Sequence, residues 1–76
     1  MSYWLRGRFG FVNFKYITYF IVVEPRGYGR EDVTKHEIHA YLTWGGNAIL
    51  AEEFDTKQEA MDHIQKLITY LNNADN

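Results

Sequence analysis

Histidines and carboxylates are the residues of this sequence that could support proton transfer or metal binding. His36, Glu37 and His39 fall within four consecutive positions. On a β-strand, His36 and His39 point to opposite faces and cannot hold one ion, whereas Glu37 and His39 share a face. No third ligand is evident beside that pair. We therefore interpret these residues as a solvated polar face and expect no metal and no cofactor.

The signatures of common catalytic sites are absent from the sequence. It contains no nucleophile elbow, phosphate-binding loop or metal-ligand spacing. The glycines at 27–30 lack the Lys-Ser/Thr ending of a phosphate loop. Glu52 and Glu53 alternate faces on a strand and cannot act as a catalytic carboxylate pair. His63 lies one helical turn after Glu59, where an ordinary i,i+4 pair is expected. We predict that the chain is not an enzyme.

The composition is typical of one small globular domain. The chain has 76 residues, of which 46% are hydrophobic and 24% charged, and these fractions indicate a folded rather than a disordered chain. A domain of this length buries only a modest core. The absence of cysteine excludes disulfides and thiolate metal sites. We interpret residues 1–76 as a single domain.

Charge is unevenly distributed along the chain. Residues 1–30 carry five basic side chains and one acidic one, whereas residues 31–76 carry three basic and nine acidic ones. The formal net charge of −2 argues against a general nucleic-acid binder.

The longest apolar run, 16–23, is much shorter than the ~20 residues of a membrane helix. We expect no membrane association and a cytoplasmic location.

The clearest predicted element is an amphipathic helix over about residues 57–72. Thr56 and Glu59 have the spacing of a capping box, in which the hydroxyl accepts a backbone N–H and the carboxylate reaches back. Asn72 and Asn73 indicate the C-terminal end of this helix. The apolar residues that recur at helical spacing are Ala60, Met61, Ile64, Leu67, Ile68 and Leu71.

The sequence upstream has the patterns of strands. Residues 35–43 alternate between apolar and polar types, and a turn at 44–47 with a returning strand at 48–54 predicts a hairpin. Residues 15–24 are rich in β-branched and aromatic types, which indicates a central strand. Residues 2–14 are interpreted as a further strand or as the first half of one long bent strand.

Together these elements predict an α+β fold. We expect a three- or four-stranded antiparallel meander sheet with the C-terminal helix packed on one face. Such a sheet has one covered face and one bare face. The bare face is therefore where a functional surface is expected.

Residues 8–14, Arg-Phe-Gly-Phe-Val-Asn-Phe, resemble the central motif of RNA-recognition domains. In that family, alternate aromatic side chains stack on bases, a role that the resemblance assigns to Phe9 and Phe11. Arg8 stands where the family has Gly. The family carries this motif on its third strand, whereas here it lies near the beginning of the sequence, so the resemblance covers one short strand.

Residues 53–60 resemble the strand-to-helix junction of the arm-binding domains of phage integrases, which read DNA with a sheet face rich in Lys and Arg. The residues expected to point outward here include Glu37, Glu52 and Glu53, which would repel phosphate. The same junction is also ordinary helix-capping chemistry.

Surplus aromatic residues in the N-terminal half point to binding, because one helix cannot cover so many rings. Tyr, Trp and Arg dominate binding hot spots. We predict a non-enzymatic protein-binding module, of inhibitor or adaptor type, that uses the N-terminal strand, the bare sheet face and the loop 26–34. The candidate partner-binding residues are Tyr3, Trp4, Arg6, Arg8, Phe9, Phe11, Arg26, Tyr28, Arg30, Glu52 and Glu53.

The small acidic layout is similar in style to phage-encoded inhibitors, including several anti-CRISPR proteins. That likeness implies steric occlusion or charge mimicry of a partner's ligand. The acidic candidates for mimicry are Glu52, Glu53, Asp55, Glu59 and Asp62.

Two alternatives remain open. The first is nucleic-acid binding, by ring stacking and phosphate contacts. Its candidate residues are Phe9, Phe11, Tyr16 and Tyr19 for stacking, and Arg6, Arg8 and Lys15 for phosphates. The second is a homodimer in which the aromatic patch is buried between two copies.

Overall fold

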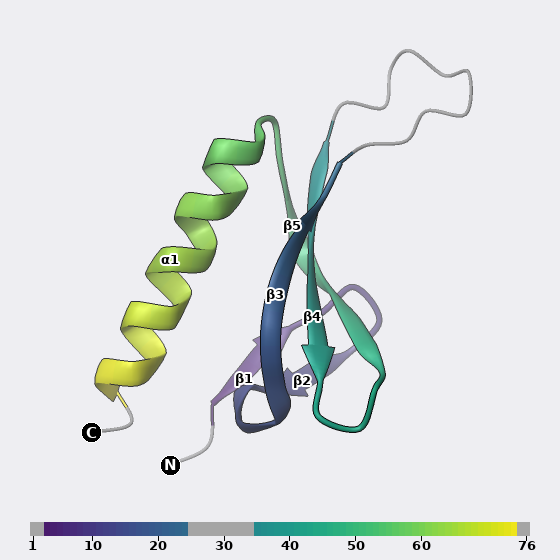
Figure 1. The fold of residues 1–76 in the computed structure, drawn as a ribbon, viewed down its shortest axis with the longest axis vertical. Coiled ribbons are helices and arrows are strands. Elements are labelled where there is room, and N and C mark those ends of the chain that lie inside the picture. Colours follow the sequence, from purple (N-terminus) through teal and green to yellow (C-terminus); the bar gives the residue numbers. More distant parts are fainter. Residues whose placement is uncertain (1–2, 25–34, 75–76) are drawn as a thin grey trace.

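The computed structural model describes residues 3–24 and 35–74 and has an α+β fold, as predicted. Strands form a two-stranded hairpin and a three-stranded sheet, and a C-terminal helix covers one face of the larger sheet (Figure 1). The elements in chain order are β1 (Trp4–Arg6), β2 (Phe11–Asn13), a 3-10 turn η1 (Phe14–Tyr16), β3 (Ile17–Val23), β4 (His36–Leu42), β5 (Asn47–Phe54) and α1 (Lys57–Ala74).

The larger sheet is antiparallel, in the order β3-β4-β5, so the expectation of a central strand at residues 15–24 is wrong: β3 is an edge strand and β4 is the central one. The predicted hairpin is confirmed: β4 and β5 pair, with Ala40 opposite Ala48. At the turn between them, Leu42 N–H donates to the carbonyl of Gly46 at 2.8 Å. Gly45 has a φ of 98° there, a conformation that favours glycine. The turn residues therefore have the local role that their composition predicts.

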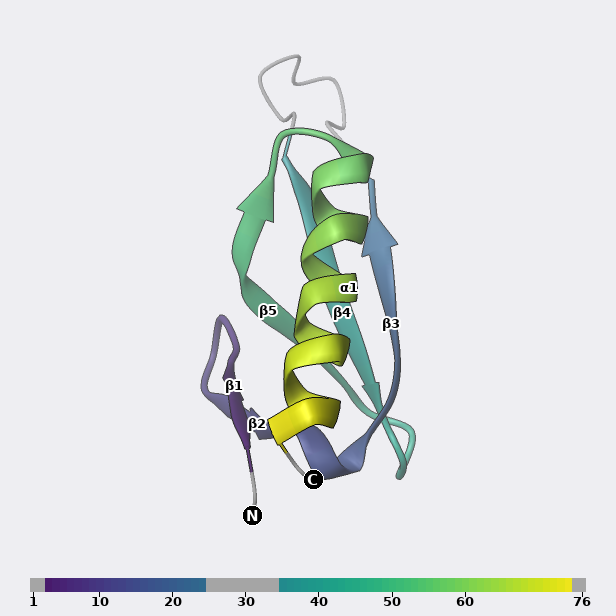
Figure 2. The ribbon, with the colours of Figure 1, turned by 90° about the vertical axis from the view of Figure 1, so that its left-hand side faces the viewer.

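The helix lies across the face of the sheet that carries the apolar positions of β4 (Figure 2). Ile38, Leu50 and Ala60 are almost completely shielded from solvent and form the centre of the core. Ala60 has no bulk beyond Cβ, so the first turn of α1 can approach the sheet closely. Burial of Ile38 alone stabilises the fold by about 2 kcal/mol. The partly buried residues around this centre are Leu5, Phe20, Val22, Phe54, Ile64 and Leu67.

The start of α1 confirms half of the predicted capping box. The Thr56 hydroxyl accepts the backbone N–H of Glu59 at 3.1 Å. The apolar stripe is narrower than expected, because Met61 is 49% exposed. The residues that meet the sheet follow the spacing of Ala60 and Ile64, and Met61 lies at the border of that stripe.

Residues 2–14 do not form one strand, and that expectation is corrected. β1 and β2 pair antiparallel as a short hairpin, with Leu5 opposite Val12. Its turn is closed by the N–H of Gly7, which donates to the carbonyl of Gly10 at 2.6 Å. After β2 the chain bends into η1, where the Asn13 side chain accepts the backbone N–H of Lys15.

The hairpin docks on the outer edge of β5. Gly7 and Leu50 form an antiparallel bridge, and Arg8 N–H donates to the carbonyl of Ile49 at 2.8 Å. A Cβ atom on Gly7 would lie 3.0 Å from the carbonyl oxygen of Gly10 and 3.2 Å from that of Ile49. Glycine is therefore needed for the close approach. The hairpin covers part of one edge of the sheet and brings Leu5 to the core.

Candidate functional site

The outer face of the β1–β2 hairpin gathers four of the predicted binding residues. Strand alternation turns Trp4 and Arg6 away from the core-facing Leu5, and Arg6 lies opposite Phe11 across the hairpin. Trp4 is 61% exposed and Phe11 is 71% exposed. We call Trp4, Arg6, Phe11 and the neighbouring turn residue Phe9 the hairpin face.

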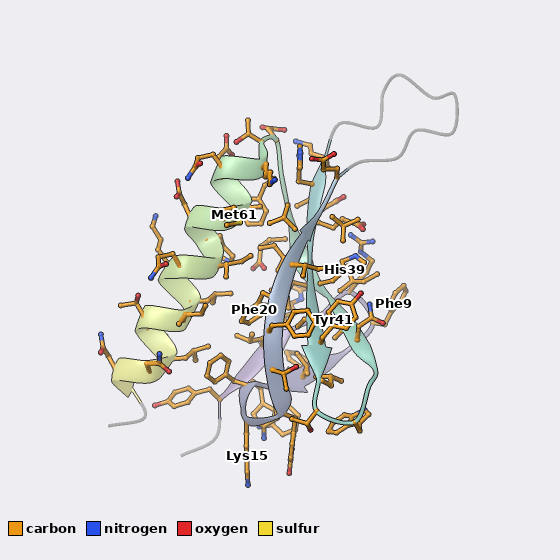
Figure 3. The ribbon with its side chains drawn as sticks, in the orientation of Figure 1. Phe9, Lys15, Phe20, His39, Tyr41 and Met61 are labelled. Atoms are coloured by element: carbon orange, nitrogen blue, oxygen red, sulfur yellow. The ribbon has the colours of Figure 1, made fainter. Side chains whose placement is uncertain are left out.

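Phe9 is the most exposed of these rings, at 89%. It lies in the turn between β1 and β2, on the side of the sheet away from α1 (Figure 3). Phe9 and Phe11 line a shallow hollow of about 330 Å³ between the hairpin and β5. Asn47 and Ile49 form the opposite wall. The hairpin face is therefore continuous with a depression whose walls are largely apolar.

The sheet face away from α1, which we call the open face, carries a polar network around Glu37. The Arg8 guanidinium lies 2.6 Å from the Glu37 carboxylate and 3.8 Å from that of Glu53. His39 Nε2 lies 3.2 Å from the other Glu37 oxygen. The prediction that Glu37 and His39 share a face is confirmed. Arg8 is paired with carboxylates of the same chain, and its role as a partner or phosphate contact stays a prediction.

The Glu37 carboxyl has a pKa below its ordinary value of 4.5. Partial burial alone raises the pKa, because it disfavours the charged form. Hydrogen bonds from Arg8 and His39, together with the charges of both side chains, lower the pKa and outweigh the burial. Glu37 is therefore held ionised at the centre of the open face.

A stacked tyrosine pair continues the open face beyond this network. The Tyr19 and Tyr41 rings have centroids 4.8 Å apart and planes within 3° of each other. The Asn47 amide nitrogen lies 3.4 Å from His39 Nδ1. His39 and Tyr41 point away from α1, whereas Phe20 points toward it (Figure 3). Rings and hydrogen-bonding groups are thus interleaved on this face.

The predicted pairing of His63 with Glu59 is replaced by contacts with β5. His63 Nε2 lies 3.9 Å from the Glu52 carboxylate, and its ring lies 5.0 Å from that of Phe54. Glu52 and Glu53 have separate neighbours, because Glu53 lies near Arg8. The two carboxylates therefore do not form one binding surface.

Lys35 and Asp55 join the end of β5 to the residue before β4 through an ion pair. A hydrogen bond from Lys35 to Asp55, followed by their opposite charges, raises the pKa of Lys35 above its ordinary value. Several of the acidic residues proposed for charge mimicry therefore have contacts within the protein. Asp62 also accepts a hydrogen bond from Gln58 at 2.9 Å.

Four other predicted binding residues are not part of the hairpin face. One lies elsewhere in the structure, and three lie outside the described residues. Tyr3 precedes β1, is partly buried, and accepts the N–H of Phe14 through its backbone carbonyl at 2.8 Å. Arg26, Tyr28 and Arg30, with the loop 26–34 that contains them, lie outside the described residues.

The segment that resembles an RNA-recognition motif does not form a central strand. Residues 8–14 comprise the rest of the hairpin turn, the short strand β2 and the first residue of η1. Phe9 and Phe11 therefore lie on a hairpin rather than on the face of the larger sheet. The candidate stacking residues also divide between surfaces, since Tyr16 contacts Trp44 and Tyr19 contacts Tyr41.

Comparison with known proteins identifies no relative: no family model, curated protein or solved structure gives a significant match to the chain. Within the ranges 3–24 and 35–74, no three ligating side chains are grouped as a metal site. In those same ranges, no helix has the length and apolar character needed to cross a membrane.

Proposed function

We propose that this chain is a small non-enzymatic protein-binding module whose partner docks on the hairpin face. One observation carries the proposal: three large aromatic side chains and an arginine are exposed together on a hairpin of two three-residue strands. Trp and Arg are enriched at the centres of protein interfaces, where a few residues supply most of the binding energy.

The contacts beneath the hairpin support this role. Leu5 packs against the core and Val12 is buried, so the inner face holds the hairpin in place. Arg8 ties the turn to Glu37 of the central strand. A surface fixed before binding loses less conformational freedom when the partner docks.

The composition of the hairpin face favours a partner with a carboxylate among apolar side chains. Arg6 lies between aromatic neighbours and can meet a carboxylate with paired hydrogen bonds. Trp4 and Phe11 supply apolar area beside it. The hollow next to Phe9 would accept one protruding apolar side chain of the partner.

Steric occlusion is the mechanism that these contacts favour. Charge mimicry would need free carboxylates, whereas Glu53 and Asp55 face Arg8 and Lys35. We therefore propose an inhibitor or adaptor of the kind that some phages encode. It acts in the cytoplasm by covering a partner's surface.

Affinity capture with matched variants tests the proposal. The bait proteins are wild type, Trp4→Ala, Phe11→Ala and Arg6→Glu, incubated with native lysate with and without nuclease. Tyr70→Ala and Lys66→Glu are matched controls on α1, where Tyr70 is 64% exposed. Circular dichroism checks that each variant is folded.

We expect wild type to capture one protein in stoichiometric amount after nuclease treatment. The three hairpin variants should lose this protein, and both control variants should retain it. If the hairpin variants capture the protein as well as wild type does, the assignment of this surface is refuted. Capture of nucleic acid, or of proteins that disappear with nuclease, would favour the stacking alternative. In that case affinity would also fall steeply with salt, and Arg6→Ala would flatten the slope.

A further inference from the structure

The two edges of the larger sheet differ in how they are covered. The β5 edge receives the hairpin through Gly7 and Arg8. Within the described part of the chain, β3 pairs with β4 alone, so its other side is an open edge (Figure 2). An open edge carries backbone N–H and carbonyl groups that can pair with another strand.

The β3 edge lacks the residues that usually prevent such pairing. From Ile17 to Val23 the strand contains no charged residue and no proline. Natural edge strands are commonly protected by lysine, proline or a bulge. Here the protection is one irregularity between Ile17 and Tyr19, at the start of the strand.

An apolar hollow adjoins the open edge. It has a volume of about 390 Å³ and lies between β3 and the middle of α1. Phe14, Ile17 and Phe20 line one side, and Ile64 and Ile68 line the other. A second strand beside β3 would therefore also cover apolar side chains of the helix.

We propose that two copies of this chain pair through their β3 edges, antiparallel, around a twofold axis perpendicular to the sheet. This symmetry produces a continuous six-stranded sheet with both helices on the same face. The hollow of one copy then adjoins the hollow of the other, so that each buries the apolar wall of its partner. The contact is self-complementary, as a twofold interface requires.

A second copy suits this edge better than a charged peptide does. Because β3 is uncharged, two copies can approach without repulsion between their paired strands, although each chain carries a net charge of −2. The core is also small for a stable monomer, and oligomerisation is a common source of additional buried area in domains of this size. The proposal does not depend on the hairpin face, which lies beyond the opposite edge.

Two measurements test the dimer. Light scattering after size exclusion, over about 1 µM to 1 mM protein, should give a mass rising to twice the 9.0 kDa of one chain. Hydrogen exchange of the wild-type protein at both ends of that range should show protection of the β3 amides that increases with concentration. The second measurement needs no variant and therefore does not depend on a substitution being tolerated.

A matched pair of variants locates the interface. Tyr19→Lys places a charge beside the open edge, where Tyr19 is 53% exposed, and should raise the dimer dissociation constant about tenfold or more. Tyr70→Lys makes the same change on α1 and should leave the constant unchanged, as should Trp4→Ala. A monomer throughout the range would overturn the proposal. A dimer without concentration-dependent β3 protection would also overturn it, as would one that Trp4→Ala disrupts.

Discussion

The Arg8 guanidinium lies 2.6 Å from the carboxylate of Glu37, and this contact joins the turn of the small hairpin to the central strand of the larger sheet. The two residues are far apart in the sequence: Arg8 lies in the turn between β1 and β2, and Glu37 lies in β4. Arg8 also lies 3.8 Å from Glu53, so one cation bridges carboxylates on two neighbouring strands. The orientation of the hairpin face therefore depends on a residue that is not itself part of that face.

Removal of the Arg8 side chain should loosen the hairpin without abolishing the fold. We expect Arg8→Ala to lower the free energy of unfolding by about 1 kcal/mol, because the ion pair is partly exposed and solvent screens it. Chemical denaturation measures the loss, and hydrogen exchange should be faster at the backbone amides of Gly7 and Arg8. Arg6→Ala is the control, since Arg6 points outward; equal losses for the two variants would contradict the bridging role of Arg8.

Acid should weaken the fold through Glu37. Its pKa is lower in the folded protein than its ordinary value of 4.5, so its stabilising contribution is complete above about pH 4.5 and is lost as pH falls through the folded pKa. Urea denaturation between about pH 5 and pH 3 should show this loss, and Glu37→Gln should remove that part of the pH dependence.

Glu59→Gln is the matched control for the acid series, because it leaves the contacts among Arg8, Glu37 and His39 in place. It should keep the wild-type loss. If Glu37→Gln and wild type lose stability in parallel across the acid range, Glu37 is not the group responsible.

A methyl group at Gly7 should separate the hairpin from β5. The added Cβ would lie 3.0 and 3.2 Å from two backbone carbonyl oxygens, and backbone atoms cannot move aside as a flexible side chain can. We expect Gly7→Ala to destabilise the protein by about 1–3 kcal/mol, in the range for overpacking. Faster exchange of the Arg8 amide, which donates to Ile49, should accompany it. An unchanged Arg8 amide would mean that the strands approach less closely than described.

The N-terminal cap of α1 should contribute measurably to stability. Thr56→Ala removes the hydroxyl that accepts the N–H of Glu59 and should cost about 1 kcal/mol in thermal or denaturant unfolding. Thr69→Ala, at an exposed position within the helix, is the comparison and should cost little, because alanine has the higher helix propensity. The cap assignment fails if the two variants are equally stable.

The elements with strong local patterns are those that the sequence could predict. Alternation along 35–43 correctly placed Ile38 and Ala40 on the buried face, and the Thr56 cap correctly placed the start of the helix. The end of the helix was less well marked, since α1 continues to Ala74 rather than ending near residue 72. The fold class can be predicted from such patterns because each pattern involves only residues that are close together in the sequence.

The candidate site depended on contacts that have no local pattern. The first fourteen residues looked like one aromatic-rich strand because the turn at Gly7–Gly10 contains no typical hairpin pair such as Asn-Gly. Nothing near Arg8 indicates that Glu37 will neutralise it, since that pairing exists only after the hairpin has docked. The sequence therefore indicates the aromatic and basic residues of the hairpin face, but it does not show that Arg8 pairs with Glu37 instead of pointing outward with them.

The bridge between Gly7 and Leu50 also determines when the hairpin can dock on β5 during synthesis. At ~5–20 residues per second, the segment between these residues takes several seconds to be made. Leu5 must wait longer still, because the core that it contacts includes Ala60 of the helix. Throughout that interval the rings of the N-terminal segment lack their final support. A chaperone that recognises exposed aromatic residues would therefore find Trp4, Phe9 and Phe11 accessible during that interval.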